Sequence, residues 1–315
     1  MAYINRVTTS ELFERVNGLR SRRTPFVLAT VVRAERPTSA KPGDCALVLP
    51  DGSMEGFVGG ACAESTVRLE GLRLLRAGES TLLRITPNAA DDGSSDTEEV
   101  EGLVTVDNPC LSGGTLEIFL EAMIPPTLVH VFGDAPVARA LVKLGAALDY
   151  DVHSATDPKA EIAPDTVAVV VASHGRDEES VLAGALRAGV PYVALVASPK
   201  RSAAVLAGLD VDDEQRQRVR APAGLDIGAR GAAEIALSVF ADLIARRPQP
   251  PPPALNADAP AATPTEAIDP VCGMTVAVST ESLSLHQLGK DWYFCGTGCR
   301  QAFADDPARY RFGEG

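Results

Sequence analysis

A run of prolines late in the chain limits how far any one core can extend. Residues 248–267 include Pro250–Pro253 and are otherwise rich in proline, alanine, threonine and aspartate. Proline fixes φ and lacks a backbone N–H, so the run favours extended polyproline geometry, at about 3 Å per residue, over helix or sheet. We read this segment as a linker that holds the residues after it at a distance.

The sequence before the linker is long enough for two domains. The whole chain has 315 residues, and single cores rarely grow beyond about 250 residues. The pattern changes at Pro125-Pro126. It predicts an N-terminal α+β domain over residues 1–124, a Rossmann-like parallel-sheet domain over 125–247, and a small C-terminal module over 268–315. The expected fold class is α/β.

The charge and the cysteine count narrow the range of partners. The formal net charge of −13 disfavours general nucleic-acid binding and a polybasic membrane contact. The longest apolar runs, such as Val167–Ala172, are too short for an integral membrane segment, and no secretory signal is visible. Six cysteines in a chain of this length do not indicate a disulfide framework. We therefore expect a cytoplasmic protein whose thiols serve metal or cofactor chemistry.

The C-terminal module carries a pattern typical of a metal site. Cys272, Cys295 and Cys299 have C-x22-C-x3-C spacing, and three thiolates suit Zn or Cu(I), with His286 as a candidate fourth ligand. A module of about 45 residues is near the lower limit for a self-sufficient core, so a metal cross-link would stabilise it. The alternative is that these cysteines are reduced and packed without metal.

In the first domain, a glycine pair directly precedes a predicted helix that has a cysteine in its first turn. Gly59 and Gly60 precede Cys62 and Glu64, and glycine lets the backbone come close to a bulky ligand. A helix N-terminus lowers the pKa of a thiol and attracts anions, which favours Cys62 as a metal or cofactor contact. The alternative is a buried, inert cysteine beside a tight turn.

A second cysteine lies beside a second glycine pair. Cys110 is followed by Gly113 and Gly114, and the alternation after them predicts a strand over 115–121. Two such loops in one small domain lead to the hypothesis that Cys62 and Cys110 face one pocket.

The remaining pattern of the first domain mixes helices and strands. Helical spacing is found over 66–76, with a stop at Ala77-Gly78. Strands are predicted over 25–32, 45–49, 81–85 and 103–106. Thr9 or Ser10 can cap a helix with one apolar face, formed by Leu12, Phe13, Val16 and Leu19.

Strand, turn and helix follow one another from residue 127, which is the start of a βαβ unit. The nucleotide-binding fingerprint needs three glycines here, but only Gly133 is present, and Ala135 leaves less room for a pyrophosphate. Pro136 suits the first helical turn. Asp157, near the end of the next strand, could hold a ribose hydroxyl or could belong to an ordinary turn.

His174 and Asp226 are two further polar residues of this domain that are candidate ligand contacts. His174 directly follows the apolar strand 167–172 and is either a ligand contact or a solvated loop residue. Asp177 is predicted to cap the next helix. Asp226 lies in a glycine-bearing loop before the helix over 232–246, where it either orders the loop or contacts a ligand.

Three motifs in the correct order resemble the XdhC/CoxI family of accessory proteins. They spread over about the first 245 residues, and the sequence around Cys110 is more similar to the CoxF branch, associated with enzymes of the carbon monoxide dehydrogenase type. The sequence departs from many relatives at Ser173–Arg176 and Pro199–Arg201. The motifs are Gly60–Glu64, Pro109–Glu117, and Ala221-Pro222 with Gly224–Ala229. The C-terminal module resembles YHS/TRASH-type metal-binding domains.

The resemblance implies a maturation factor for molybdenum hydroxylases. Such a protein would transiently bind the molybdenum cofactor, as molybdopterin or its cytosine dinucleotide, near Cys62, support its sulfuration, and deliver it to the hydroxylase apoenzyme. A cysteine desulfurase would be a further partner, and self-association into a homo-oligomer is expected. On this reading the chain is a cofactor carrier and not a turnover enzyme.

Two other functions stay open at this point. One is an oxidoreductase that uses NAD(P) on the Rossmann-like domain, which Ala135 disfavours. The other is a metal sensor or metallochaperone in which the C-terminal module is the active part.

Overall fold

The computed structural model describes residues 9–87, 97–100, 102–108, 114–246, 265–279, 281–287 and 289–310. The chain forms two compact units. The first consists of Met1–Pro125 together with Ala262–Gly315, and the second of Pro126–Ala261. The C-terminal module thus shares a unit with the N-terminal domain, whereas the proline run predicts that it is held at a distance.

A mixed seven-stranded sheet forms the N-terminal part of the first unit. Its strand order is β3-β2-β1-β7-β4-β6-β5, and β4 and β6 are its parallel pair among mostly antiparallel neighbours. The elements are α1 (Thr9–Ser21), β1 (Phe26–Ala34), β2 (Cys45–Val48), β3 (Met54–Gly56), α2 (Ala61–Ala77), β4 (Thr81–Pro87), β5 (Thr97–Val100), β6 (Leu103–Asn108) and β7 (Leu116–Met123). Helices packed with a mostly antiparallel sheet agree with the α+β domain that the sequence predicts.

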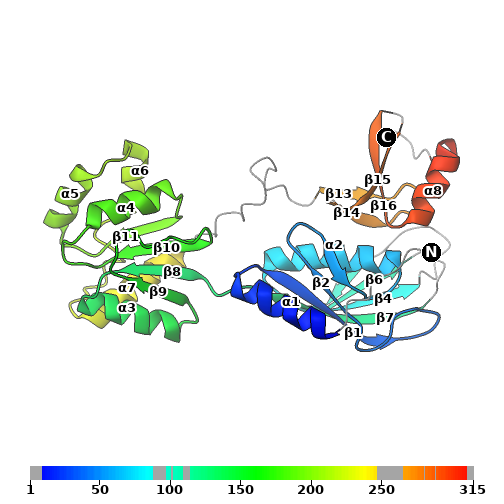
Figure 1. The fold of residues 1–315 in the computed structure, drawn as a ribbon, viewed down its shortest axis with the longest axis horizontal. Coiled ribbons are helices and arrows are strands. Elements are labelled where there is room, and N and C mark those ends of the chain that lie inside the picture. The colour runs from blue at the N-terminus through cyan, green and yellow to red at the C-terminus, as the bar shows by residue number, and fades with distance from the viewer. Residues whose placement is uncertain are drawn as a thin grey trace. The chain divides into compact units, whose positions relative to one another are not determined.

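Helices α1 and α2 cover opposite faces of this sheet (Figure 1). Alternate residues of a strand point to opposite faces, and in β1 Val27 belongs to the core under α2, whereas Phe26 belongs to the core under α1. Helix α1 contributes Leu12, Val16 and Leu19 to its core as expected. The prediction for Phe13 was wrong, because its side chain is 58% exposed. Phe13 lies at the edge of the apolar face of α1, outside the part of that face that packs against the sheet.

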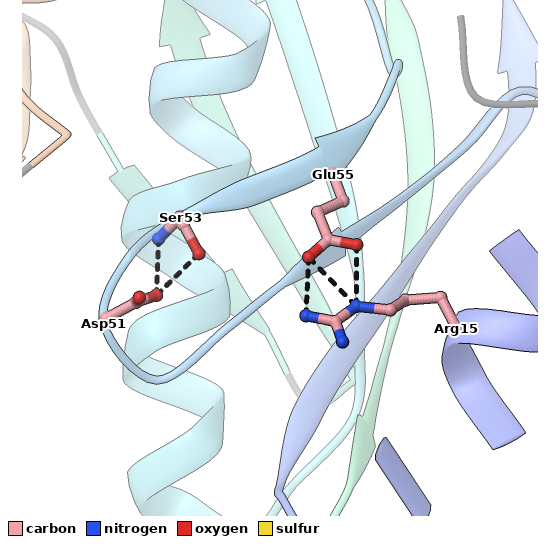
Figure 2. Close-up of polar contacts among 4 residues, drawn as sticks. All are labelled: Arg15, Asp51, Ser53 and Glu55. Atoms are coloured by element: carbon pink, nitrogen blue, oxygen red, sulfur yellow. Dashed lines mark hydrogen bonds and ion pairs between the residues drawn. The ribbon is translucent and has the colours of Figure 1, made fainter. Parts of the chain in front are cut away.

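A salt bridge fixes α1 to the β2–β3 hairpin (Figure 2). Arg15 donates from Nε to Oε2 of Glu55 at 2.9 Å and from Nη2 to Oε1 at 2.8 Å. The hydrogen bond to Glu55 raises the pKa of Arg15. The hairpin turn is closed by Asp51, whose Oδ1 accepts from the Ser53 backbone N–H at 2.9 Å and from its hydroxyl at 2.7 Å. The hairpin thereby positions the segment that leads to Cys62.

The second unit is a doubly wound sheet of five parallel strands. The order is β12-β11-β10-β8-β9, and every pair is parallel. The elements are β8 (Leu128–Phe132), α3 (Pro136–Ala147), β9 (Asp151–Ala155), β10 (Thr166–Val171), α4 (Glu178–Arg187), β11 (Tyr192–Leu195), α5 (Pro199–Gly208), α6 (Asp213–Arg218), β12 (Val219–Arg220) and α7 (Ala232–Arg246). Helices α3 and α7 pack on one face and α4 and α5 on the other (Figure 1). All six residues of β10 are buried, as a central parallel strand requires.

The C-terminal module is built from two small hairpins and one helix. Its aromatic core centres on Phe303, which is 1% exposed and contacts Trp292, Phe294 and Tyr310. Its first strand begins inside the range assigned to the linker. The elements are β13 (Thr265–Ile268), β14 (Thr275–Val278), β15 (Leu283–Gln287), β16 (Lys290–Phe294), α8 (Thr297–Asp305) and the 3-10 helix η1 (Pro307–Tyr310).

Within the ranges that the structure describes, no helix combines the length and the apolar character needed to cross a membrane.

Candidate metal and cofactor site

The glycine pair before α2 forms the tight entry that the sequence predicts. Gly59 has φ +144°, and a Cβ there would lie 3.0 Å from the Cβ of Ala63. Gly60 is the N-cap of α2, with extended backbone and no side-chain capping hydrogen bond. Cys62 is half-buried in the first helical turn, which confirms the predicted position on the helix. Because no side chain caps it, this end of α2 keeps backbone N–H groups available for an anionic partner.

Glu64 lies one residue beyond Ala63 in the first turn and is half-buried. Burial raises its pKa, and the nearby charge of Arg68 acts in the opposite direction. Burial likewise lowers the pKa of Arg68, against the charges of Glu64 and Glu281. The first turns of α2 therefore hold an acid and a base in a poorly solvated setting close to Cys62.

The second glycine loop is described only at its end. Cys110 and Gly113 lie outside the described residues, so the shared pocket of Cys62 and Cys110 stays a prediction. At Gly114 a Cβ would lie 2.3 Å from the backbone oxygen of Pro37. A close approach of two backbone segments therefore accounts for Gly114 without a ligand.

Three cysteines of the C-terminal module converge as their spacing predicts. The Sγ atoms of Cys272 and Cys295 are 3.5 Å apart, and those of Cys295 and Cys299 are 3.6 Å apart. Four ligands at a Zn–S distance of 2.3 Å in a tetrahedron are about 3.8 Å from one another. The sulfur positions therefore fit a tetrahedral soft metal ion closely.

Asp269 joins this cluster, although the sequence analysis did not select it. One carboxylate oxygen of Asp269 and the three Sγ atoms lie within 4.8 Å of one another. The residue is completely buried, and burial raises its pKa. Its oxygens accept from the backbone N–H groups of Val271 at 2.9 Å and Cys295 at 2.8 Å. Asp269 thereby ties together the two loops that carry the cysteines. The one feature of the sequence that could have identified Asp269 as part of the cluster is its position three residues before Cys272.

His286 does not lie in the cluster. It is exposed, and its Nδ1 lies 2.6 Å from Oδ1 of Asp291 on the neighbouring strand. As a metal ligand it would require a different arrangement of β15 and β16.

Hydrogen bonds among the thiols shift the pKa values of the clustered cysteines in opposite directions. Bonds from Cys272 and Cys295 lower the pKa of Cys299 to about 3. Bonds with Cys272, Cys299 and Cys62, in that order, raise the pKa of Cys295. The cluster thus holds one thiolate beside two thiols. A metal ion that binds there would displace the remaining thiol protons.

At Gly133 the degenerate nucleotide loop of the second unit lies close against the backbone that follows β10. Gly133 has φ +121°, and a Cβ there would lie 2.3 Å from the backbone oxygen of Ala172. Pro136 is the first residue of α3, as predicted. Asp157 is exposed, and its Oδ1 accepts from the backbone N–H of Lys159 at 2.9 Å. Packing and turn formation thus account for both Gly133 and Asp157.

The loop after β10 has a different anchor from the one predicted. Asp177 is the N-cap residue of α4, as predicted, but its side chain makes no capping hydrogen bond and its backbone is left-handed at φ 52°. Glu178 is the buried residue instead, and it accepts from the Gly175 backbone N–H at 2.6 Å and from Arg201 at 2.8 Å. His174 is exposed, also with positive φ. The loop is thus ordered by Glu178, which the sequence analysis did not select.

Asp226 lies in the exposed loop before α7. Its Oδ1 accepts from the backbone N–H of Gly228 at 3.4 Å. This contact matches the loop-ordering alternative.

Comparisons with known proteins account for all three parts of the chain. Residues 19–86 match the XdhC and CoxI family, residues 129–243 match the XdhC Rossmann domain, and residues 267–312 match the YHS domain. The chain thus contains a region similar to the XdhC and CoxI family, an XdhC-type Rossmann domain and a YHS domain. The Rossmann-like and YHS predictions are thereby confirmed. Cys62 lies within the XdhC/CoxI match, and the three clustered cysteines lie within the YHS match.

Two relatives are found in Escherichia coli (strain K12). The molybdenum cofactor insertion chaperone PaoD is 24% identical over 265 residues, which cover 70% of this chain and 83% of PaoD. The uncharacterized protein YqeB is 26% identical over 265 residues, covering 74% of this chain. The chain spans only 46% of the length of YqeB.

One solved structure, described as a xanthine dehydrogenase from Bacillus halodurans, aligns with a TM-score of 0.35 and 18% identity. The alignment covers 78% of this chain and 97% of that one.

Proposed function

We propose that this protein is a molybdenum cofactor insertion chaperone that holds the cofactor at the N-terminus of α2. The observation that carries the proposal is Cys62 in the first turn of a helix that no side chain caps, inside the region that matches the XdhC and CoxI family. The similarity to PaoD supports the same function.

The chemistry of this helix end suits such a cargo. Thiolates are ligands for soft transition metals, and helix N-termini bind phosphate groups. Gly60 is exposed and leaves the backbone accessible, and Glu64 provides a poorly solvated acid beside the thiol. In this proposal Cys62 contacts the metal end of the molybdopterin, or of its cytosine dinucleotide, and the backbone N–H groups contact the phosphate.

The finer steps follow from the family resemblance. The chain would support sulfuration of the bound cofactor with a cysteine desulfurase, and then deliver it to the apoenzyme of a molybdenum hydroxylase in the cytoplasm. It would act as a homo-oligomeric carrier and not as a turnover enzyme.

The first experiment measures the cargo directly. The chain is co-expressed with intact cofactor biosynthesis and purified without oxygen, and its molybdenum and pterin are quantified. We expect both in the wild type and a loss of about 10-fold or more in Cys62→Ala, because a metal ligand is removed. The matched control is Cys45→Ala, a half-buried cysteine at the start of β2. Equal pterin content in the wild type and Cys62→Ala would contradict the proposed site.

A metal sensor or metallochaperone is a second candidate, favoured by the YHS cysteine cluster. Truncation after Arg247 separates the two functions. The carrier proposal expects pterin binding to survive, whereas the metal-sensor alternative expects all specific binding to be lost. NAD(P) chemistry on the Rossmann domain is disfavoured by Ala135, which stands where the nucleotide-binding fingerprint has its second glycine.

A further inference from the structure

The YHS domain packs along α2 of the first domain. Arg73 of α2 donates to Oε1 of Glu266 on β13 from Nε at 3.1 Å and from Nη2 at 2.9 Å. Ala277 of β14 is 3% exposed and belongs to the hydrophobic core that α2 covers. A Cβ on Gly52 would lie 2.8 Å from the Cβ of Ser279. Ionic, apolar and steric contacts thus hold the two parts of this unit together.

This packing brings Cys62 to the metal-binding cysteines. Cys62 packs against the small core of Met274, Val276 and Cys295. Its thiol is hydrogen-bonded with that of Cys295. Next to it, a Cβ on Gly296 would lie 3.3 Å from the Cβ of Ala61, so the two backbones meet closely. Residues more than 200 positions apart in the sequence therefore contribute sulfur to one place.

Three cysteines leave one position of a tetrahedral site to be filled. Asp269 is the nearest oxygen donor, but its carboxylate already accepts two backbone hydrogen bonds, from Val271 and Cys295. His286 is paired with Asp291 outside the cluster. A soft ion prefers a thiolate to a carboxylate, and Cys62 offers one on the side where the two domains meet.

Two helix N-termini favour the negative charge of such a site. Cys62 lies in the first turn of α2, and Cys299 lies in the first turn of α8. The N-caps are Gly60 and Gly296, and neither helix has a side-chain capping hydrogen bond. The unpaired N–H groups and dipoles of both helices stabilise thiolates nearby.

We propose that a tetrahedral soft metal ion such as Zn²⁺ binds Cys272, Cys295 and Cys299 of the YHS domain together with Cys62 of the XdhC/CoxI-type domain. Coordination replaces the thiol proton of Cys62, which goes to solvent, by a sulfur–metal bond. The metal then fastens the YHS domain over the end of α2 and covers Cys62. The inference goes beyond cofactor insertion. Because Cys62 cannot contact this metal and the molybdenum cofactor at the same time, the metal-bound state would withhold Cys62 from a pterin.

X-ray absorption at the zinc edge tests this ligand set on the full-length chain. The metal-free protein is loaded anaerobically with one equivalent of Zn²⁺. We expect a first shell of four sulfurs in the wild type and of three sulfurs in Cys62→Ser. Three sulfurs with one oxygen or nitrogen in both proteins would overturn the proposal. The wild-type spectrum decides the question even if the variant does not fold.

Competition with a chromophoric chelator gives the corresponding affinity. We expect Cys62→Ser to weaken Zn²⁺ binding by about 10-fold or more, since loss of even an indirect contact to a metal commonly costs that much. Cys45→Ser is the matched control, because Cys45 bonds to the Gly43 backbone oxygen at 3.3 Å and is not in the cluster. We expect it to bind Zn²⁺ as the wild type does. Equal Zn²⁺ affinity in Cys62→Ser and the wild type would also overturn the proposal.

Discussion

The helices α2 and α3 begin in similar ways but meet different surroundings. Each follows a loop with a positive-φ glycine, and neither has a side-chain capping hydrogen bond. In front of α2 lie the sulfur atoms of the YHS domain, whereas the loop before α3 is packed against the backbone of Ala172. A helix N-terminus thus becomes a candidate site only where the fold also brings reactive side chains to it.

The charges around the start of α3 are already paired within the Rossmann domain. Arg176 forms an ion pair with Asp134, and Arg139 donates to the backbone oxygen of Asp134 at 2.5 Å. Around α2 the corresponding groups are a thiol and a poorly solvated acid, Cys62 and Glu64. The paired charges at the start of α3 hold its loop in place, whereas the thiol and the acid at the start of α2 suit a ligand.

The largest effect is expected from Gly133→Ala, which tests whether the loop before α3 is closed by packing. The added Cβ would lie 2.3 Å from a backbone oxygen and would sit on a residue with φ +121°. Strain and overpacking together should destabilise the Rossmann domain by about 3 kcal/mol. The measurement is urea unfolding of the full chain, followed by circular dichroism.

The matched control for that variant is Gly184→Ala in α4, where a Cβ meets nothing within 4 Å. Alanine is the better helix former by about 1 kcal/mol, so this variant should be neutral or stabilising. If Gly133→Ala were equally harmless, the loop before α3 would have room for a ligand and the contrast with α2 would disappear.

A smaller effect is expected from Gly296→Val, which tests the contact in front of α2. A Cβ added at this position would lie 3.3 Å from the Cβ of Ala61, and valine carries two further methyl groups on that Cβ. We expect the YHS domain to leave α2, so that Cys62 in the zinc-loaded protein is alkylated about 10-fold faster, a change of about 1.4 kcal/mol in the opening equilibrium. Mass spectrometry of the modified peptides measures the rate for each cysteine.

Gly298→Ala is the control, since that glycine of α8 also has open space around it. We expect Gly298→Ala to leave Cys62 as protected as in the wild type. Unchanged protection of Cys62 in Gly296→Val would show that the packing of the YHS domain on α2 does not depend on this contact.

Local features of both regions could be predicted from the sequence. The glycine pair and the helical spacing after it placed Cys62 in a first turn, and cysteine spacing placed Cys272, Cys295 and Cys299 together. These predictions depend on residues within one element or one small domain. The same holds for the apolar strand β10 and for Pro136 at the start of α3.

What could not be predicted depends on contacts between distant segments. Nothing in the local sequence of Cys62 indicates that Cys295 lies beside it, because this follows from the packing of the YHS domain on α2. The choice of Asp269 over His286 near the cluster depends on which loop is buried. Likewise, Glu178 is a buried anchor only because α5 brings Arg201 to it.

The smallest effect on stability is expected from Tyr192→Phe. This variant tests how the buried carboxylate of Asp242 differs in its surroundings from that of Asp269. Asp242 in the Rossmann domain accepts from the Tyr192 hydroxyl at 3.0 Å and from Arg246 at 2.9 Å, whereas Asp269 accepts from backbone beside the clustered thiols. Burial, followed by the charge of Asp242, raises the pKa of Tyr192, so the hydroxyl stays a donor.

Removal of that hydroxyl should cost about 1 kcal/mol, because Arg246 still balances the carboxylate of Asp242. Urea unfolding measures the loss, and Zn²⁺ affinity should not change, since the network lies in the other unit. A change in Zn²⁺ affinity in Tyr192→Phe would contradict the independence of the two regions. An unchanged affinity with lowered stability would support the view that the network of Tyr192, Asp242 and Arg246 stabilises the Rossmann domain alone.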